Sequence, residues 1–197
     1  MNGQVVRARL PVVGIAASAG GPAALAVILP DIAGLRAAVL VVQHLHPKFV
    51  DEFVAWMTRV SALTVEVAAG AMRLRPGVVY LAVPGRHLKL GAGGRTVVLD
   101  DEPASLHRPS ADELFHSLAR HAGADGIGVV LTGLGDDGAS GLLALRRAGG
   151  TTLVQDAGSS AVHGMPAAVT LLGAADRQVA LADMGRAIRV AVRARLG

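Results

Sequence analysis

The chain has 197 residues, of which 52% are hydrophobic and none is cysteine, so it can bury a core as one domain but has neither disulfides nor thiolate chemistry. Its formal charge is +4 at pH 7, but only 3% of its residues are aromatic, which leaves few side chains on which nucleic acid bases can stack. No apolar run reaches the roughly 20 residues of a membrane span and the N-terminus lacks a secretory signal, so we expect a cytoplasmic protein with no nucleic acid partner and no membrane insertion.

Short apolar runs alternate with helical patterns along most of the chain. Strands are expected at residues 10–16, 37–43, 126–133 and 151–156, which are almost continuously apolar, as in a parallel sheet covered on both faces. Helices are expected at residues 22–29, 48–59, 138–148 and 166–172. This alternation predicts an α/β fold, with a doubly wound, mostly parallel Rossmann-like sheet and helices on both faces.

The alternation of strand and helix patterns is interrupted between residues 72 and 100. Turn residues at Pro84-Gly85 and at 91–94 divide this stretch into three short strands, which we expect to form an antiparallel hairpin insertion. A helix is then expected within residues 107–123, with Ser110 as its N-cap, Glu113 completing a capping box and Gly123 as its stop.

The turn after the first predicted strand reads GIAASAGGPAAL over residues 14–25. It lacks the lysine and the Ser or Thr of a Walker phosphate loop, and alanines stand at positions 16 and 19, where a dinucleotide fingerprint has glycines. Around Ser18 the turn is similar to a G-x-S-x-G nucleophile elbow, in which small neighbours let a strand turn sharply into a helix. Ser18 is therefore either a nucleophile or a cap for the helix that starts at Pro22.

Two further polar residues follow predicted strands. In a doubly wound sheet, ligands bind at the carboxyl ends of the strands. Ser18 follows the first strand, His44 closes the second, and Asp137 follows the strand at 126–133. A histidine near a serine can take its proton, and a carboxylate on the other ring nitrogen stabilises the imidazolium. These positions favour a Ser18, His44 and Asp137 triad, although a lone histidine at a strand end is more often structural.

Six blocks of sequence carry a family resemblance. In chain order they are ASAGGPAAL, VVQHLHPKF, LRPGVVYLAVPGRHLKL, HRPSADELFHSLA, GVVLTGLGDDGASGL and VQDAGSSAVHGMP. Over residues 10–175 they resemble the catalytic domain of CheB-type chemotaxis protein-glutamate methylesterases. The resemblance implies hydrolysis of glutamate methyl esters on the cytoplasmic helices of chemoreceptors, with release of methanol. It also implies deamidation of receptor glutamines in many members, and no cofactor.

The resemblance also implies roles for individual residues. It makes Ser18 the nucleophile, His44 the base and Asp137 the partner that orients this base. The backbone amides near Ala19 and Leu134 are then oxyanion donors. Arg108 and the C-terminal arginines are expected to steer acidic receptor helices toward the site, and a merely solvated basic surface is an equal interpretation.

The chain departs from the usual family pattern at several positions. Ala19 and Leu134 stand where many members have threonine and methionine, Asp136 stands in place of an asparagine, and His163 in place of a frequent tyrosine. The usual enzyme also has an N-terminal receiver domain. We expect residues 1–197 to form a single catalytic domain without a receiver, so that any control comes from a separate response regulator or array partner.

Two other functions stay open. In a metal-dependent hydrolase, His44 and His46 with Asp136 and Asp137 are suitable ligands for zinc or manganese, but no third histidine has the spacing of a metal motif, so we expect no metal. Alternatively, the domain is a non-catalytic scaffold that binds receptor-like helices. The retained serine, histidine and acid argue against this scaffold.

Overall fold

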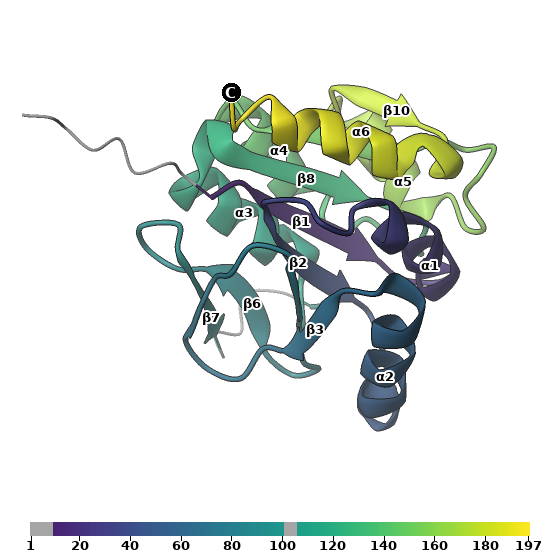
Figure 1. Ribbon diagram of the computed structural model, residues 1–197. Helices are drawn as coiled ribbons and strands as arrows, with labels where there is room; N and C mark the ends of the chain where they lie inside the picture. The colour runs from purple at the N-terminus through teal and green to yellow at the C-terminus, as the bar shows by residue number, and fades with distance from the viewer. Residues whose placement is uncertain (1–9, 101–105) are drawn as a thin grey trace, which may run out of the picture.

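The computed structural model describes residues 10–100 and 106–197. Its main element is a seven-stranded parallel sheet with the strand order β10-β9-β8-β1-β2-β5-β3 (Figure 1). These strands are β1 (Val12–Ala17), β2 (Ala38–Gln43), β3 (Thr64–Val67), β5 (Val78–Leu81), β8 (Gly126–Val130), β9 (Thr151–Gln155) and β10 (Arg177–Val179). The predicted doubly wound, mostly parallel α/β fold is confirmed.

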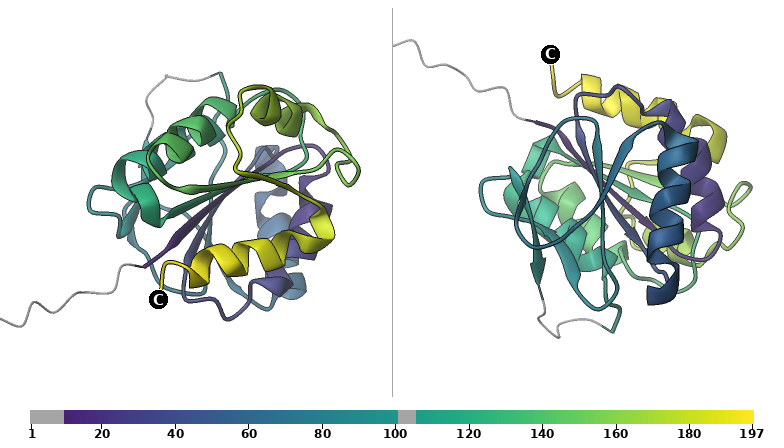
Figure 2. Two further views of the ribbon diagram at one scale, coloured as in Figure 1. Left: turned by 90° about the horizontal axis from the view of Figure 1, so that it is seen from above. Right: turned by 60° about the horizontal axis from the view of Figure 1, so that its bottom comes forward.

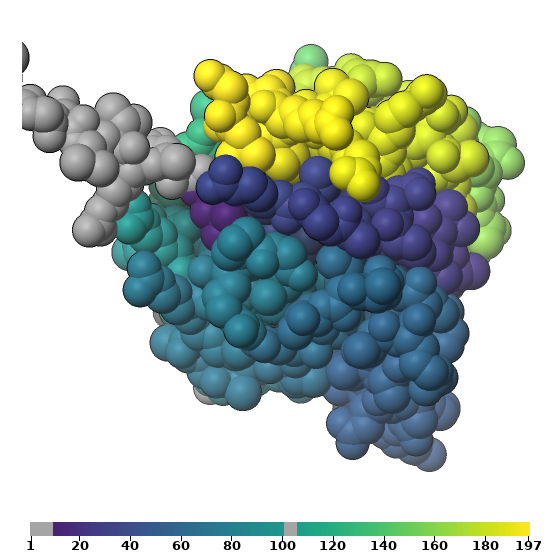
Figure 3. Space-filling model, viewed as in Figure 1, coloured from purple at the N-terminus to yellow at the C-terminus, as the bar shows by residue number. Residues whose placement is uncertain are grey.

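Helices cover both faces of this sheet (Figure 2). One face carries α1 (Gly21–Asp31), α2 (Val50–Ser61) and α6 (Leu181–Arg193), and the other carries α3 (Ala111–His121), α4 (Ala139–Arg147) and α5 (Gly164–Leu171). Single 3-10 turns lie at Pro47–Phe49 and Gly123–Asp125. In the space-filling view, α2 projects from the body at the lower right (Figure 3). Each helix expected from the sequence is present, with boundaries shifted by a few residues.

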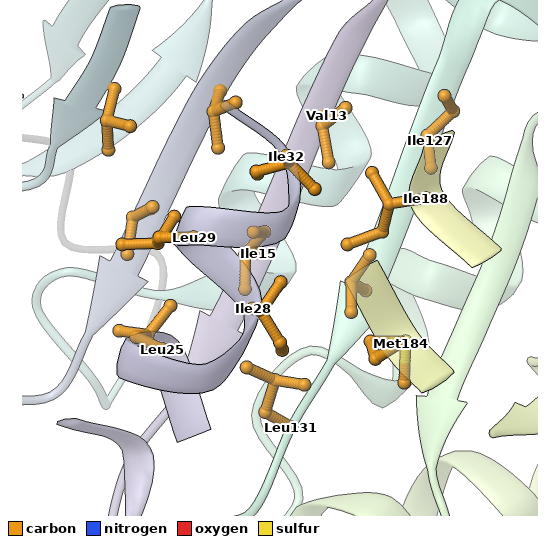
Figure 4. Close-up of a cluster of buried hydrophobic side chains, with 14 of the residues drawn as sticks. Val13, Ile15, Leu25, Ile28, Leu29, Ile32, Ile127, Leu131, Met184 and Ile188 are labelled. Atoms are coloured by element: carbon orange, nitrogen blue, oxygen red, sulfur yellow. The ribbon is translucent and has the colours of Figure 1, made fainter. Parts of the chain in front are cut away.

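Alternate side chains of β1 point to opposite faces of the sheet, and each face has its own hydrophobic core. Val13 and Ile15 point into the cluster formed with α1 and α6, where Ile28 of α1 and Ile188 of α6 meet them (Figure 4). Val12 belongs to the second cluster, with α3, α4 and α5. Full burial of each such side chain stabilises the fold by about 1.5–3 kcal/mol. The carboxyl ends of the central strands are thereby held firmly.

The expected antiparallel insertion of three strands is confirmed, but its first strand is shorter than expected. It is a three-stranded sheet of order β4-β7-β6, made by β4 (Met72–Arg73), β6 (His87–Leu90) and β7 (Thr96–Asp100). The expected first hairpin strand is in fact two strands, because Gly77 has a φ of 76° and turns the chain after β4. The following Val78–Leu81 is buried throughout, as in a strand covered on both faces, and it joins the parallel sheet between β2 and β3.

Three elements were not expected from the sequence. Strands β3 and β10 form the two edges of the main sheet and are partly exposed. Helix α6 buries Met184, Ile188 and Val192 and leaves Arg186 and Arg193 exposed, so the basic C-terminal residues belong to an amphipathic helix. None of the helices in the described ranges is both long and apolar enough to cross a membrane.

Candidate active site

Ser18 is the first residue after β1. Its backbone N–H donates to the Thr132 carbonyl oxygen at 3.1 Å, and its own carbonyl oxygen accepts from the Gly21 N–H at 2.9 Å. The N-cap of α1 is Gly20, with a φ of 79°, and α1 has no side-chain cap. Ser18 therefore does not cap α1, and its half-buried side chain lies at the carboxyl end of the sheet.

The loop after β8 passes directly against Ser18. A β-carbon placed on Gly133 would lie 2.8 Å from the Ser18 β-carbon and 2.3 Å from the sulfur of Met165. Both separations are shorter than van der Waals contact, so only glycine fits here. This close approach brings the loop of Asp137 to the same edge of the sheet as Ser18.

His44 follows β2, on the other side of Ser18. Its backbone N–H donates to the carbonyl oxygen of Ala17 at 3.0 Å, which continues the pairing of β1 with β2 by one step. Its ring Nε2 lies 2.9 Å from Oδ2 of Asp137. The His107 ring stacks on the His44 ring with centroids 4.9 Å apart and planes 15° apart. The plane of the His44 ring is thus held by one carboxylate and one ring.

Asp137 is held more tightly than any other acid in this site, with a side chain only 2% exposed. Besides His44, it accepts from the Ser110 hydroxyl at 2.8 Å and from the backbone N–H groups of Ala111 at 2.7 Å and Asp112 at 3.0 Å. Burial raises the pKa of Asp137, but these four hydrogen bonds outweigh burial and leave the pKa below its ordinary value. The carboxylate is therefore charged at neutral pH.

The two adjacent acids have different surroundings. Asp136 is exposed, whereas Asp137 is buried and contacts His44. Leu134, in the same loop, is 66% exposed. In the described parts of the chain, the backbone N–H groups of Ala19 and Leu134 have no hydrogen-bond acceptor. The two N–H groups therefore have no acceptor within this part of the protein.

Arg108 and His163 lie in loops that border the site. Arg108 is exposed, follows His107 directly, and accepts the Gly85 N–H on its carbonyl oxygen at 3.1 Å. His163 precedes α5 and pairs with Gly133 through an isolated parallel bridge. The Nδ1 atom of His163 is buried and has no partner within residues 10–100 and 106–197. Both residues therefore stand beside the loops of His44 and Asp137 without bonding to either side chain.

A second serine and histidine lie near the same carboxylate. The backbone N–H of Ser110 donates to Nδ1 of His87 at 3.2 Å, while the Ser110 hydroxyl donates to Asp137. Both side chains are completely buried, so a polymeric substrate has no access to them. Ser110 and His87 therefore support Asp137 from behind, whereas the side chain of Ser18 is only half-buried.

Ser110 is confirmed as the N-cap of α3, because its hydroxyl oxygen accepts from the Glu113 N–H at 3.4 Å. The expected capping box is wrong in its other half. The Glu113 carboxylate pairs with the Lys89 ammonium at 2.8 Å, and the Ser110 N–H is already bonded to His87. Sequence analysis also missed the contact of Ser110 with Asp137, since the two residues are far apart in sequence.

His46, one of the four residues of the alternative metal-dependent hydrolase, makes contacts of its own. Its Nδ1 accepts from the Lys48 N–H at 3.4 Å, and its ring packs edge-on against Phe49 with centroids 6.0 Å apart. Over the described ranges, no three His, Asp or Glu side chains gather in a way that could hold a metal ion. His44 and Asp137 instead form a hydrogen-bonded pair, which is the contact that a base and its orienting acid require.

Comparisons with known proteins agree with this geometry. The sequence profile of the CheB methylesterase family matches residues 13–188. A protein-glutamate methylesterase/protein-glutamine glutaminase from Bordetella bronchiseptica is 44% identical over 178 residues, covering 88% of this chain and 51% of the relative. The protein-glutamate methylesterase/protein-glutamine glutaminase 3 of Anaeromyxobacter dehalogenans is 46% identical over 171 residues, covering 86% of this chain and 50% of the relative. The chain thus spans about half the length of the curated relatives it matches.

A solved structure extends the agreement to three dimensions. The crystal structure of the Thermotoga maritima CheB methylesterase catalytic domain superposes with a TM-score of 0.85 at 31% identity. The superposition covers 92% of this chain and 98% of the Thermotoga domain. With this fold and a profile match that runs from β1 into α6, the chain belongs to the CheB methylesterase family.

Proposed function

We propose that this chain hydrolyses glutamate methyl esters on chemoreceptors and releases methanol. The observation that carries this proposal is the 2.9 Å hydrogen bond between His44 and Asp137, at the end of the strand that neighbours the one presenting Ser18. A charged, buried acid on one nitrogen of a histidine is what a serine nucleophile requires of its base. The relatives' names give the ester class.

In this reaction, the Ser18 hydroxyl oxygen bonds to the ester carbonyl carbon while its proton moves to His44. Because Nε2 of His44 is bonded to Asp137, Nδ1 is the nitrogen that accepts this proton. The carbon–methoxy bond then breaks, and the same proton leaves with methanol. A water molecule attacks the acyl-serine by the same route in reverse, which yields free glutamate and restores Ser18.

The oxyanion of each tetrahedral intermediate is stabilised by the backbone N–H groups of Ala19 and Leu134. Neither group is used elsewhere within the described residues. Donors fixed in a folded loop need no reorganisation as charge develops, and one such donor is worth about 100- to 1000-fold in kcat. The replacement of the usual family side chains at both positions leaves these donors intact, because they belong to the backbone.

The same machinery acts on a primary amide, with ammonia leaving in place of methanol. The curated relatives carry the name protein-glutamine glutaminase as well as methylesterase. Glutamine deamidation is therefore the second activity we propose for this site. The exposed Arg108 beside it is suited to attract glutamate-rich receptor helices.

The test measures methanol release from a methylated receptor cytoplasmic fragment. The parent chain should turn over, Ser18→Ala and His44→Ala should lose most activity, and all should keep the same circular dichroism spectrum. Ser110→Ala is the matched serine comparison, because it leaves Ser18 in place and removes one hydrogen bond to Asp137 together with the side-chain cap of α3. Full activity in folded Ser18→Ala would contradict the mechanism. Loss of activity in Ser110→Ala alone would show that Ser18 is wrongly assigned as the nucleophile.

A further inference from the structure

We propose that Gln43 is a positioning residue that fixes the spacing between the turn bearing Ser18 and the strand end bearing His44. This inference rests on the proposed function. Gln43 is the last residue of β2 and its side chain is almost wholly buried, at 3% exposure. The side chain is therefore almost inaccessible to solvent and to a substrate.

The carboxamide of Gln43 holds both catalytic segments by their main chains. Its Nε2 donates to the Ser18 carbonyl oxygen at 2.9 Å and to the His44 carbonyl oxygen at 3.0 Å. A primary amide carries two N–H donors on one nitrogen, so a single group can join two acceptors. Gln43 is thus bonded to the residue that bears the nucleophile and to the residue that bears the base.

These bonds lie where the strand pairing stops. Ala17 pairs with Gln43 as the final partners of β1 and β2, and the His44 N–H still reaches the Ala17 carbonyl oxygen at 3.0 Å. Beyond this point the segment after β1 turns into α1, and the segment after β2 leads into the 3-10 turn at Pro47–Phe49. The Gln43 side chain supplies the connection that the ladder no longer provides, and so sets the separation of the Ser18 and His44 main chains.

Packing fixes the carboxamide itself. A β-carbon on Gly21 would lie 2.0 Å from Oε1 and 2.9 Å from Cδ of Gln43, so the first residue of α1 must be glycine to admit this group. Oε1 is buried and has no hydrogen-bond partner among the described residues. A buried amide oxygen without a partner is unfavourable, and an apolar side chain would avoid it. The position therefore uses the amide for its two N–H donors.

The consequence for catalysis is specific. Loss of the bridge changes the alignment of the Ser18 hydroxyl with His44, which affects the chemical step. Because Gln43 does not touch the substrate, substrate binding is unaffected. Misplacement of reacting groups by about 1 Å costs roughly 100-fold in rate. The effect should therefore appear in kcat and leave KM unchanged.

The experiment uses Gln43→Met, which keeps the volume and removes both donors, and Gln43→Glu, which keeps the shape and replaces the donors with an acceptor. We expect kcat for methanol release to fall roughly 10- to 100-fold, with KM within about twofold of the parent. The rate of Ser18 labelling by a fluorophosphonate probe should fall by a similar factor, and this reading needs no receptor substrate. Ser117→Ala is the control, because it loses the buried hydrogen bonds of Ser117 to the Leu90 N–H of β6 and to the Leu114 carbonyl of α3, and it should keep the parent kcat.

The outcomes separate this inference from the proposed function. An inactive parent chain that also resists the probe contradicts both. An active parent with unchanged kcat in either folded Gln43 variant overturns the positioning role alone, as does a raised KM at constant kcat. If both Gln43 variants fail to fold while Ser117→Ala folds, Gln43 is structural and the proposal is wrong.

Discussion

The hydroxyl of Ser110, which caps α3, donates to the carboxylate of Asp137 at 2.8 Å. Asp137 also accepts the first two backbone N–H groups of that helix, from Ala111 and Asp112. The residue that orients His44 is therefore also part of the N-terminal cap of α3. Anions are favoured at a helix N-terminus, so the helix helps to keep this acid charged.

Asp137→Asn should weaken both contributions, because the amide keeps one acceptor oxygen but loses the other and the negative charge. The amide can present N–H donors where His44 and the helix need an acceptor, so we expect kcat to fall by about ten-thousandfold. The weaker support of the helix N-terminus should lower the free energy of unfolding by about 1–2 kcal/mol. Steady-state methanol release and urea unfolding measure the two effects. The exposed neighbour gives the control, Asp136→Asn, which should stay within a few-fold of the parent, and the reverse order would show that the two acids are wrongly assigned.

The lowered pKa of Asp137 predicts a pH dependence of stability. The group is charged in the folded state at pH values where it is protonated when unfolded, so it stabilises the fold fully above its unfolded pKa of about 3.9. This contribution is lost as the pH falls through the lower folded pKa. The stability deficit of Asp137→Asn, from urea unfolding at several pH values, should be constant above about pH 5 and shrink in acid. A deficit independent of pH would contradict the charged carboxylate.

Asp112 supplies a control of opposite sign. Burial, and then the charge of Asp137, raise the pKa of Asp112 above its ordinary value. Its ionisation therefore opposes folding, and this penalty disappears as the pH falls through the raised pKa. Relative to the parent, the stability of Asp112→Asn should be greater at neutral pH than in acid. A shift in the same direction as that of Asp137→Asn would contradict the assignment of the two carboxyl groups.

Gly133→Ala should displace Ser18, the proposed nucleophile. The added methyl group would lie 2.3 Å from the Met165 sulfur and 2.8 Å from the Ser18 β-carbon, so the loop must move. We expect a loss of stability of about 1–3 kcal/mol and a larger proportional loss of kcat. Thermal unfolding and methanol release give the two values. At Gly158 a β-carbon meets nothing within 4 Å and φ lies outside the left-handed region, so Gly158→Ala should change neither quantity.

The basic surface beside the site predicts a salt effect. If Arg108 attracts an acidic receptor helix, Arg108→Gln should lower kcat/KM on the receptor fragment about threefold at low salt. The difference from the parent should vanish near 300 mM salt, because screening removes long-range attraction. Hydrolysis of a small neutral ester should be the same in both proteins. Equal salt curves for the two substrates would favour a merely solvated basic surface.

Sequence reasoning worked where the hydrophobic pattern was unambiguous. The central strands β1, β2, β8 and β9 are buried on both faces, so their apolar runs leave no other assignment. It failed at β3 and β10, where edge strands of four and three residues carry polar side chains. It also placed the fully buried β5 in the insertion, because a four-residue apolar run does not reveal which sheet it joins.

In the candidate site, too, some features were predictable from the sequence and others were not. Ser18, His44 and Asp137 were predicted from their positions after strands and from motif blocks, and the structure brings His44 and Asp137 into contact. The supporting contacts of Gln43 and Ser110 were not predicted. These depend on side-chain rotamers and on the approach of segments 25 or 27 residues apart, for which the sequence has no periodic signal.

The backbone N–H groups of Ala111 and Asp112, which point at the Asp137 carboxylate, are also natural reporters. Their hydrogens can exchange with solvent only when the first turn of α3 opens, and that same opening takes the acid away from His44. Amide exchange at these two positions therefore measures, in the absence of any substrate, the fraction of time for which Asp137 is hydrogen-bonded to His44. If a variant or binding partner speeds this exchange tenfold at unchanged global stability, the open state, in which Asp137 is separated from His44, has become tenfold more populated.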